Sequence, residues 1–248
     1  MPNYGIKTGL NPAFVITGQK KDELIAEDPK SAEIIRPLLR GRDVDPYLIN
    51  FADQWLIFTR KGVDITRYPA IEAHLRPFYD DLRPRNNGEP SGRKPGPYKW
   101  YEIQDNVAYY QDFEKPKIIY PNMTSVLPFV YDKGAFYTNQ KCFIITGERL
   151  GYLTAFFNSK LFRYCFKSNF PELPGVTREL SKVFFDQIPV KPVTDEQEKY
   201  YLEKVEYIQK VKKKGLDTKD LEEEIENNLA GDFQLSSEER AAILASTD

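Results

Sequence analysis

The chain has 248 residues, of which 41% are hydrophobic and 14% aromatic, a composition that buries a core and excludes a wholly disordered protein. No apolar run approaches the roughly 20 residues that a membrane span needs, and Met1 is followed by turn formers rather than by the apolar segment of a signal peptide. Two cysteines, Cys142 and Cys165, are too few for a disulfide framework or a zinc site, so we expect a cytoplasmic protein without a membrane partner.

The formal net charge of −2 is divided unevenly along the chain. Residues 1–192 carry 27 Lys+Arg and 22 Asp+Glu, a net charge of +5, whereas residues 193–248 carry 8 and 15, a net charge of −7. A mildly basic body with an acidic tail fits a protein that binds a polyanion through one face. The same boundary divides the chain into a body, 1–192, and a tail, 193–248.

The first third of the chain alternates between loops, strands and short helices. Residues 4–11 are rich in turn formers and predict a loop, and residues 13–17 predict a strand. Asp28 followed by Pro29 resembles a helix N-cap, so we expect a short helix that ends at Gly41. Residues 55–59 predict a strand that ends in a basic turn, and residues 66–82 predict a helix interrupted by Pro77.

Residues 83–99 form the least compact stretch of the sequence. It contains four prolines, three glycines and five basic residues against a single acid, Glu89. Long loops inside a compact domain are uncommon and are often functional. The alternative interpretation is an ordinary solvated loop.

The middle of the chain is rich in β-strand signals. Short strands are predicted at 117–120, 128–131, 135–138 and 142–146, and Asp132-Lys133-Gly134 predicts a hairpin turn between the second and third of them. Residues 148–167 carry apolar residues at helical spacing and predict a helix. A last strand is expected at Val183-Phe184-Phe185, before Ile188-Pro189-Val190.

The tail predicts a pair of helices. Thr194 and Gln197 form a capping box, and the helix that follows ends at Gly215. A second helix opens at Thr218, and Ser236 with Glu239 forms a second capping box before a short terminal helix. The expected fold is therefore α+β, with a twisted, β-helix-like or mixed-sheet body and a C-terminal α-hairpin.

The sequence offers no catalytic centre, so we expect no catalytic residues and no metal site in this chain. The single histidine, His74, has no evident nucleophile or acid partner, and we interpret it as solvated or capping. Neither a glycine-rich phosphate loop nor a cluster of metal ligands is present. The tetrapeptide Asn11-Pro12-Ala13-Phe14 resembles the motif of amino-methyltransferases, but its third residue departs from the motif and only ten residues precede it. A stand-alone hydrolase has little support.

Basic and amide side chains gather where strands and helices meet loops, a placement that suits contacts to phosphates and base edges. Asn11, Asn122 and Gln140 are available for adenine or backbone contacts, and Tyr98 and Trp100 flank the basic loop. The candidate DNA-binding residues are Lys7, Thr8, Asn11, Arg40, Arg42, Arg60, Lys61, Arg83, Arg85, Arg93, Lys94, Lys99 and Lys117. The five basic residues of the 83–99 loop are expected to enter a groove of the DNA: Arg83, Arg85, Arg93, Lys94 and Lys99. The residues expected to hold phosphates are Lys7, Thr8, Arg40, Arg42, Arg60, Lys61 and Lys117.

Several segments, taken in order, resemble the specificity domain of Taq-type adenine DNA methyltransferases and of fused type IIG restriction–modification enzymes. Residues 221–239 resemble the helical end of such proteins more loosely, because Glu226 and Asn227-Asn228 depart from the family pattern. The resembling segments are Gly5–Ile16, Ile35–Val44, Tyr68–Leu75, Trp100–Ile103, Phe113–Tyr120, Phe157–Leu161 and Ile188–Val190.

The resemblance implies that residues 1–192 are a DNA target-recognition domain and that the partner is double-stranded DNA. It also implies a catalytic methyltransferase domain, in cis or in trans, that flips and methylates adenine at N6. The cofactors S-adenosylmethionine and, as an open alternative, Mg²⁺ would belong to that parent enzyme, with none in this chain. Met1 lies close to the start of the family's domain, which indicates a fragment or a truncated relative.

A second function remains open at this point. The aromatic body and the acidic hairpin also suit a protein-interaction module that docks to partner subunits. Neutralising the five basic residues of the 83–99 loop separates the two hypotheses, because DNA binding depends on those charges and partner docking does not.

Overall fold

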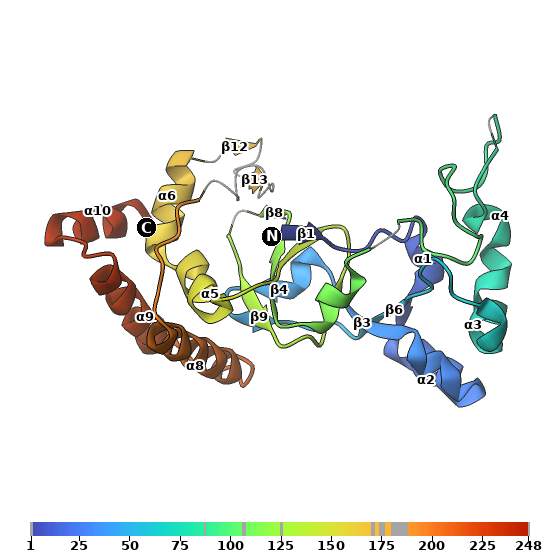
Figure 1. Ribbon diagram of the computed structural model, residues 1–248, viewed down its shortest axis with the longest axis horizontal. Coiled ribbons are helices and arrows are strands. Elements are labelled where there is room, and N and C mark those ends of the chain that lie inside the picture. Colours follow the sequence, from blue (N-terminus) through green and yellow to red (C-terminus); the bar gives the residue numbers. More distant parts are fainter. Residues whose placement is uncertain are drawn as a thin grey trace.

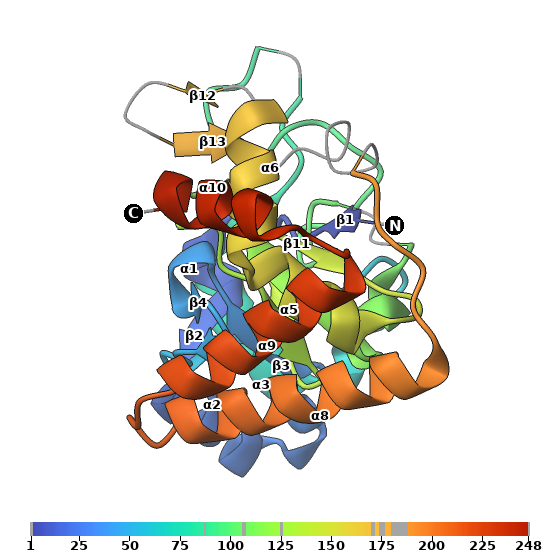
Figure 2. The same ribbon diagram turned by 90° about the vertical axis from the view of Figure 1, so that its left-hand side faces the viewer.

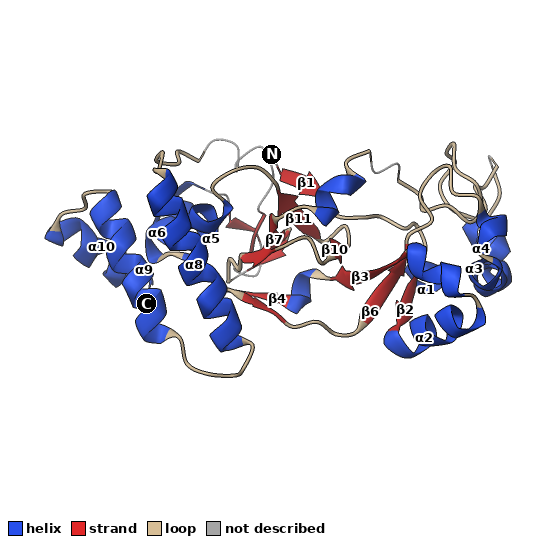
Figure 3. Cartoon of the chain, turned by 60° about the horizontal axis from the view of Figure 1, so that its bottom comes forward, coloured by secondary structure: helices blue, strands red, loops and turns tan. Residues whose placement is uncertain are grey.

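The structure is a computed structural model that describes residues 2–86, 88–105, 108–124, 126–169, 172–173, 177–179 and 188–247. Figure 1 shows an elongated molecule, with strands in the middle and helices at both ends. The same distribution is clear in Figure 3, where the helices lie outside a central group of strands. The chain is therefore α+β, as expected, and its sheets are mixed or antiparallel.

The N-terminal end is built on a four-stranded sheet of order β10-β3-β6-β2. Strands β3 and β10 are parallel, and the other neighbours are antiparallel. Phe14, Leu56 and Leu75 are fully buried in the core that the helices make with this sheet. The elements are α1 (Asn11–Phe14), β2 (Val15–Thr17), α2 (Gly18–Glu27), β3 (Ile35–Leu39), β6 (Gln54–Ile57), α3 (Pro69–Leu75), α4 (Tyr79–Leu82) and β10 (Tyr137–Thr138).

The central sheet is antiparallel and has the order β1-β11-β7-β9. Its strands are β1 (Pro2–Tyr4), β7 (Lys117–Pro121), β9 (Val130–Asp132) and β11 (Cys142–Ile145). Alternate residues of a strand face opposite sides of a sheet. Ile119 and Ile144 accordingly pack with the N-terminal core, whereas Ile118 and Phe143 pack with a second core. The sheet is covered on both faces, which explains why β7 and β11 are buried along their whole lengths.

The second core joins this sheet to the helices at the other end of the molecule. Figure 2 looks onto that end, where α8, α9 and α10 lie in front of α5. Tyr201, Val205 and Ile225 of the C-terminal helices are buried with Tyr120 and Phe156 in one cluster. Body and tail therefore share a core. The helices are α5 (Leu150–Asn158), α6 (Lys160–Asn169), α8 (Asp195–Lys212), α9 (Lys219–Asp232) and α10 (Ser237–Thr247).

Shorter elements complete the described chain. Two small sheets are formed by β4 (Val44–Asp45) with β5 (Leu48–Ile49), and by β8 (Met123–Thr124) with β13 (Thr177–Glu179) and β12 (Glu172–Leu173). Single 3-10 turns occupy Pro29–Glu33, Gly41–Asp43, Ile65–Arg67, Arg76–Phe78 and Tyr110–Glu114. Among the described helices, none is long and apolar enough to cross a bilayer.

Most predicted elements are present, and four predictions are corrected. The strand predicted at residues 13–17 begins only at Val15, because residues 13–14 belong to the short helix α1. The ten-residue helix α2 that follows was missed by the sequence analysis. Asp28 does cap a helical turn that begins at Pro29. That turn ends at Glu33, however, and residues Ile35–Leu39 form strand β3 instead of the helix predicted up to Gly41. The helix predicted at 148–167 is broken at Ser159, whose extended backbone separates α5 from α6. The turn at 132–134 joins strands of two different sheets, so it makes no hairpin.

Both predicted capping boxes are confirmed. The Thr194 hydroxyl accepts from the Gln197 N–H, and the Gln197 amide oxygen accepts from the Thr194 N–H. Ser236 and Glu239 exchange the same pair of hydrogen bonds ahead of α10. The strand expected at 183–185 lies outside the described residues.

Candidate functional site

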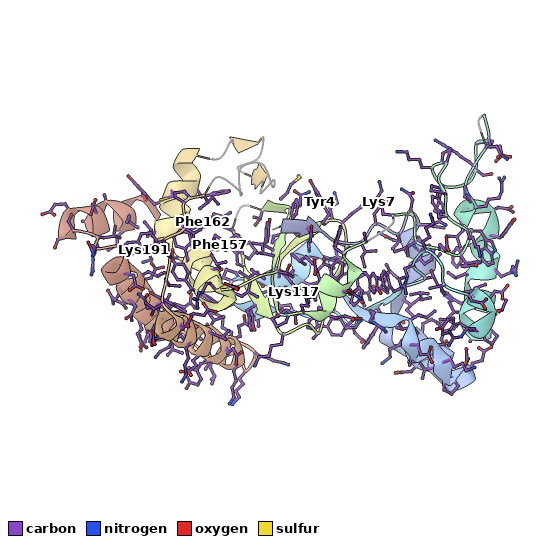
Figure 4. All side chains as sticks on the ribbon, viewed as in Figure 1. Tyr4, Lys7, Lys117, Phe157, Phe162 and Lys191 are labelled. Atoms are coloured by element: carbon purple, nitrogen blue, oxygen red, sulfur yellow. The ribbon has the colours of Figure 1, made fainter. Side chains whose placement is uncertain are left out.

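The N-terminal segment, residues 5–11, runs between two groups of candidate residues. At one end the Ile6 N–H donates to the Thr138 carbonyl (2.7 Å), and the Ile6 carbonyl accepts from the Gln140 N–H (3.0 Å). At the other end the Thr8 carbonyl accepts from the Gln104 N–H (3.1 Å). Lys7 lies between these anchors and is exposed, on the same side of the molecule as Tyr4 in Figure 4.

Thr8 and Asn11 are joined by a side-chain hydrogen bond at the start of α1. The Thr8 side chain is buried, and its hydroxyl donates to Asn11 Oδ1 (2.8 Å), where α1 begins. A buried hydroxyl with an internal partner is not presented to a ligand, so the expected phosphate contact of the Thr8 side chain is corrected. Asn11 is exposed.

Arg40 and Arg42 line a surface hollow of about 630 Å³ beside the central sheet. Three backbone segments converge there: the Asn139 N–H donates to the Leu39 carbonyl (3.0 Å), and the Asn122 N–H donates to the Lys141 carbonyl (2.8 Å). The remaining lining residues are Gly41, Val44, Asp45, Pro121, Met123, Thr124, Val126 and Pro128.

Arg40 is held in place by a buried carboxylate. Its guanidinium donates from Nε and a terminal nitrogen to the two oxygens of Asp43 (2.9 and 2.8 Å), and Asp43 is 3% exposed. This hydrogen bonding raises the pKa of Arg40. Arg42, two residues later, is exposed and has no partner among the described residues. The hollow thus presents one oriented cation and one free cation, with Lys141 exposed on its rim.

Arg93 is an anchor of the 83–99 loop and does not project from it. Its side chain donates to the carbonyls of Leu82 (2.6 Å), Thr8 (2.9 Å) and Trp100 (3.0 Å), and the residue is 4% exposed. Burial lowers the pKa of Arg93 to about 10. The expectation that Arg93 enters a groove is therefore corrected: it fixes the loop to the N-terminal segment.

The other loop cations differ in how freely they are presented. Arg83 donates to Glu89 Oε2 (2.6 Å) within the loop, a contact that raises the pKa of Arg83. Arg85, Lys94 and Lys99 are exposed. In Figure 1 the loop extends beyond α4 at one end of the molecule.

Lys117 is the second corrected cation. It is fully buried, and its ammonium donates to the Phe113 carbonyl (2.6 Å) and to Asp132 Oδ2. Burial lowers the pKa of Lys117, although Asp132 opposes the shift. Figure 4 places Lys117 within the middle of the molecule, so it holds the central sheet and not a phosphate.

Arg60 and Lys61 are exposed at the turn after β6. The Arg60 guanidinium lies 4.7 Å from the centre of the Tyr110 ring. The Thr59 carbonyl accepts from the Ile103 N–H (2.8 Å), and the N–H of the next residue, Gln104, donates to the Thr8 carbonyl. Residues 103–104 therefore separate the Arg60 turn from Lys7.

The structure thus brings Arg40 and Arg42 together at the hollow. The segment that carries Lys7 is bonded through its backbone to residues 138–140, next to the hollow, and to residue 104, next to the Arg60 turn. Two exposed residues of the hollow were missed by the sequence analysis, Lys141 and Met123, and so was Asn139. The polar run 139–141 immediately before β11 would have indicated Asn139 and Lys141, since loop residues at strand ends are the ones a sheet presents. Met123 follows the end of β7 and has no such polar signal.

The single histidine, His74, lies between two helices of the N-terminal end. His74 Nε2 lies 3.1 Å from the Ala13 carbonyl and connects α3 to α1, and burial lowers its pKa. Phe14, in the methyltransferase-like tetrapeptide, is fully buried. Over the described ranges, no group of three or more His, Cys, Asp and Glu residues is arranged to hold a metal ion.

Comparison with known proteins links this arrangement to one family. Residues 36–190 match the TaqI-like C-terminal specificity domain. The chain is 22% identical over 145 residues to the type II methyltransferase M.BstVI of Geobacillus stearothermophilus, a match that covers 57% of this chain and 24% of the methyltransferase.

Comparison with solved structures identifies a shared fold in MmeI. The type IIL restriction–modification enzyme MmeI, solved in complex with DNA, aligns over 95% of this chain with a TM-score of 0.65 and 14% identity. The type IIG restriction endonuclease BpuSI aligns over 83% with a TM-score of 0.49 and 12% identity. The chain spans about a quarter of the length of the matched methyltransferase and a third of the MmeI chain.

Proposed function

The chain belongs to the family of TaqI-like C-terminal specificity domains, and on that premise we propose that it reads the target sequence in double-stranded DNA for a restriction–modification enzyme. MmeI, whose fold it shares, was solved in complex with DNA. In this proposal the chain supplies recognition, and the chemistry belongs to another part of the parent enzyme.

The observation that carries the proposal is the set of exposed cations on segments fixed to one another by hydrogen bonds. Arg42 and Lys141 border the hollow, Lys7 lies on the segment to which the Arg93 side chain fixes the 83–99 loop, and Lys94 is exposed on that loop. Cations on a rigid frame contact phosphates without a large ordering cost.

The arrangement of the ends supports a single binding side. In Figure 1 the 83–99 loop with α4 rises at one end and α6 at the other, both on the side where β1 and β8 lie. Figure 4 places Lys7 on that side, between the two ends. The proposed contact residues are Lys7, Asn11, Arg40, Arg42, Arg60, Lys61, Arg83, Arg85, Lys94, Lys99 and Lys141.

A salt titration of duplex binding tests this proposal. Each phosphate contact contributes about −0.9 to the slope of log K against log salt, so removing one contact lowers the magnitude of the slope by about 1. We expect that change for Arg42→Gln and Lys141→Gln. Lys199→Gln, on the exposed face of α8, is the matched control and leaves the slope unchanged. A flat plot for the wild-type chain overturns the proposal.

The parent enzyme is the second part of the proposal. The matched relative is a methyltransferase, and we assign methyl transfer from S-adenosylmethionine to adenine N6, and any cleavage, to a catalytic domain in the same protein. The described residues supply DNA contacts to that chemistry and no step of it. Expressing the chain with its upstream coding sequence and assaying site-specific methylation tests this assignment.

A further inference from the structure

We infer that Asn122 and the loop that follows it read an A·T base pair in the major groove, with Asn122 on the adenine and Met123 on the thymine methyl group. This inference rests on the proposed function and adds which residues specify sequence. It concerns residues 121–124 and 126–128, which begin at the end of β7; all of them except Leu127 line the hollow.

The loop presents apolar side chains that the fold does not use. Met123 and Val126 are 56% and 54% exposed, whereas their neighbours Leu127 and Phe129 are buried. Large exposed apolar side chains beside a hollow mark binding surfaces. In the major groove the apolar feature is the thymine methyl group.

The loop is held rigidly enough to position a side chain. Thr124 and Met123 pair with Arg178 and Glu179 of β13, and the Asn122 N–H is bonded to the Lys141 carbonyl. Leu127 has a φ of +53°, a left-handed conformation that is rare for a leucine. Such backbone conformations persist where the surrounding structure enforces them, and they cluster at binding sites.

Asn122 is available for a base where Asn139 is not. The Asn139 side-chain oxygen accepts from the Lys141 N–H (3.0 Å), so that amide is already used by the fold. Asn122 Oδ1 is buried and has no hydrogen-bond partner among the residues that the structure describes. A buried acceptor without a partner is costly, and a rotation of the side chain toward the hollow offers it one.

The chemistry of an amide selects adenine. Its oxygen accepts from adenine N6 while its NH₂ group donates to N7, a pairing that no other base offers in the major groove. Arg40, Arg42 and Lys141 line the same hollow and supply the phosphate contacts that hold the loop in register on the duplex. In the hollow, the cations therefore position the DNA, and the Asn122 amide recognises the base.

Selection of bound duplexes from a random library, followed by sequencing, tests the inference on the full chain. We expect the wild-type consensus to contain an A·T pair whose replacement by G·C lowers affinity about 5- to 150-fold. Asn122→Ala abolishes the preference at that position and keeps the rest of the consensus. Asn227→Ala, an exposed asparagine on α9, is the matched control and keeps the entire consensus.

Base analogues on the wild-type chain make the test independent of folding by the variant. We expect 7-deazaadenine at the read position to weaken binding, and uracil in place of its thymine to weaken binding less in Met123→Ala than in the wild type. A consensus that Asn122→Ala leaves unchanged at every position, or a site insensitive to 7-deazaadenine throughout, overturns this inference while DNA recognition stands. Failure of the wild-type chain to enrich any duplex overturns the proposed function instead.

Discussion

At the scale of single residues, the Lys117–Asp132 ion pair is a buried contact whose loss should destabilise the fold strongly. Both side chains are almost fully buried, and Asp132 also accepts from the backbone N–H groups of Ala135 (3.2 Å) and Phe136 (3.1 Å). Lys117→Ala leaves that carboxylate buried without its counter-charge, which costs about 3–5 kcal/mol. We expect urea denaturation to show this loss in the free energy of unfolding.

Lys115 provides the control for this prediction. It pairs with Asp112 at 2.8 Å, but its side chain is 59% exposed, and exposed pairs contribute about 0–1 kcal/mol. Equal destabilisation by Lys115→Ala and Lys117→Ala would contradict the argument from burial.

Glu89 gives the 83–99 loop a predictable response to acid. Hydrogen bonds from the Asn86 N–H, the Arg83 guanidinium and the Asn86 amide lower the pKa of Glu89 to about 2. Because the folded pKa lies below the unfolded value, these contacts are fully present above about pH 4.5 and are lost as the pH falls toward 2. We expect the protection factors of the amides at residues 83–86, which are the exchange rates corrected for the intrinsic effect of pH, to fall as the pH is lowered over that range.

The substitution Glu89→Gln should reproduce the loosened loop at pH 7 and remove its dependence on acid. Glu223→Gln, an exposed acid on α9, is the control and leaves exchange in the loop unchanged. Protection factors in the loop that stay constant down to pH 2 would show that Glu89 does not organise it.

The thirteen candidate residues illustrate what residue type predicts and what it does not. Placement in predicted loops and turns indicated that Lys7, Arg42 and Lys94 are surface cations, and they are exposed. Lys117 has the same chemistry, but its register opposite Asp132 on β9 brings a counter-charge to it from 15 residues away. Pairing between strands decides which lysine is structural, and no local pattern contains that information.

At the scale of elements, two side chains of α8 connect it to the body through main-chain groups. The Glu198 carboxylate accepts from the N–H groups of Gly151 and Tyr152 (2.9 Å each) at the start of α5, where free N–H groups need acceptors. The Gln209 amide donates to the Tyr131 carbonyl and accepts from its N–H (2.9 Å each), at the open edge of β9. Both contacts substitute for secondary-structure partners.

Removing these contacts should destabilise the fold by small, measurable amounts. We expect Gln209→Ala to cost about 1–3 kcal/mol, because two backbone groups lose their partners. Glu198→Ala should cost about 1–2 kcal/mol through the lost cap. Thermal unfolding measures both against Glu203→Ala, an exposed acid on the same helix for which we expect a change within about 0.5 kcal/mol.

The predicted elements that were wrong share a physical cause. Ile35–Leu39 follows a good helix N-cap, yet β3 forms because its partners β6 and β10 complete a sheet. Likewise Asp132-Lys133-Gly134 has the composition of a hairpin turn, but β9 pairs with β7 and β10 pairs with β3. The capping boxes of α8 and α10 were predicted correctly because a cap depends on four adjacent residues alone.

At the scale of the whole molecule, the central sheet connects two cores that face opposite ends. Ile119 and Ile144 point to the N-terminal core, and Ile118 and Phe143 to the C-terminal one. The hollow lies beside the end of β7 and the start of β11, the two inner strands of this doubly covered sheet, so its cations and Asn122 keep their positions relative to both ends of the molecule. A specificity domain needs that rigidity, because a base contact is useful only when the phosphate contacts hold the duplex in register.

The shared core also predicts how the chain responds to truncation. Ending it at residue 192 removes the buried side chains of Tyr201, Val205, Ile208, Ile225 and Leu229 from the second cluster. Five such side chains contribute on the order of 10 kcal/mol, which is comparable to the whole stability of a typical domain, about 5–15 kcal/mol. We therefore expect residues 1–192 alone to lose cooperative unfolding and to expose apolar surface.

A truncation at residue 235 is the matched control, because α10 contributes a single residue that is buried, Ile243, among those whose side chains the structure describes. We expect this chain to unfold cooperatively and to retain its near-UV circular dichroism, while the 1–192 chain binds a hydrophobic dye and loses that signal. This result would show that the acidic tail is needed to complete the core of the basic body. Cooperative unfolding of residues 1–192 at undiminished stability would mean that the tail only rests on a body that folds by itself.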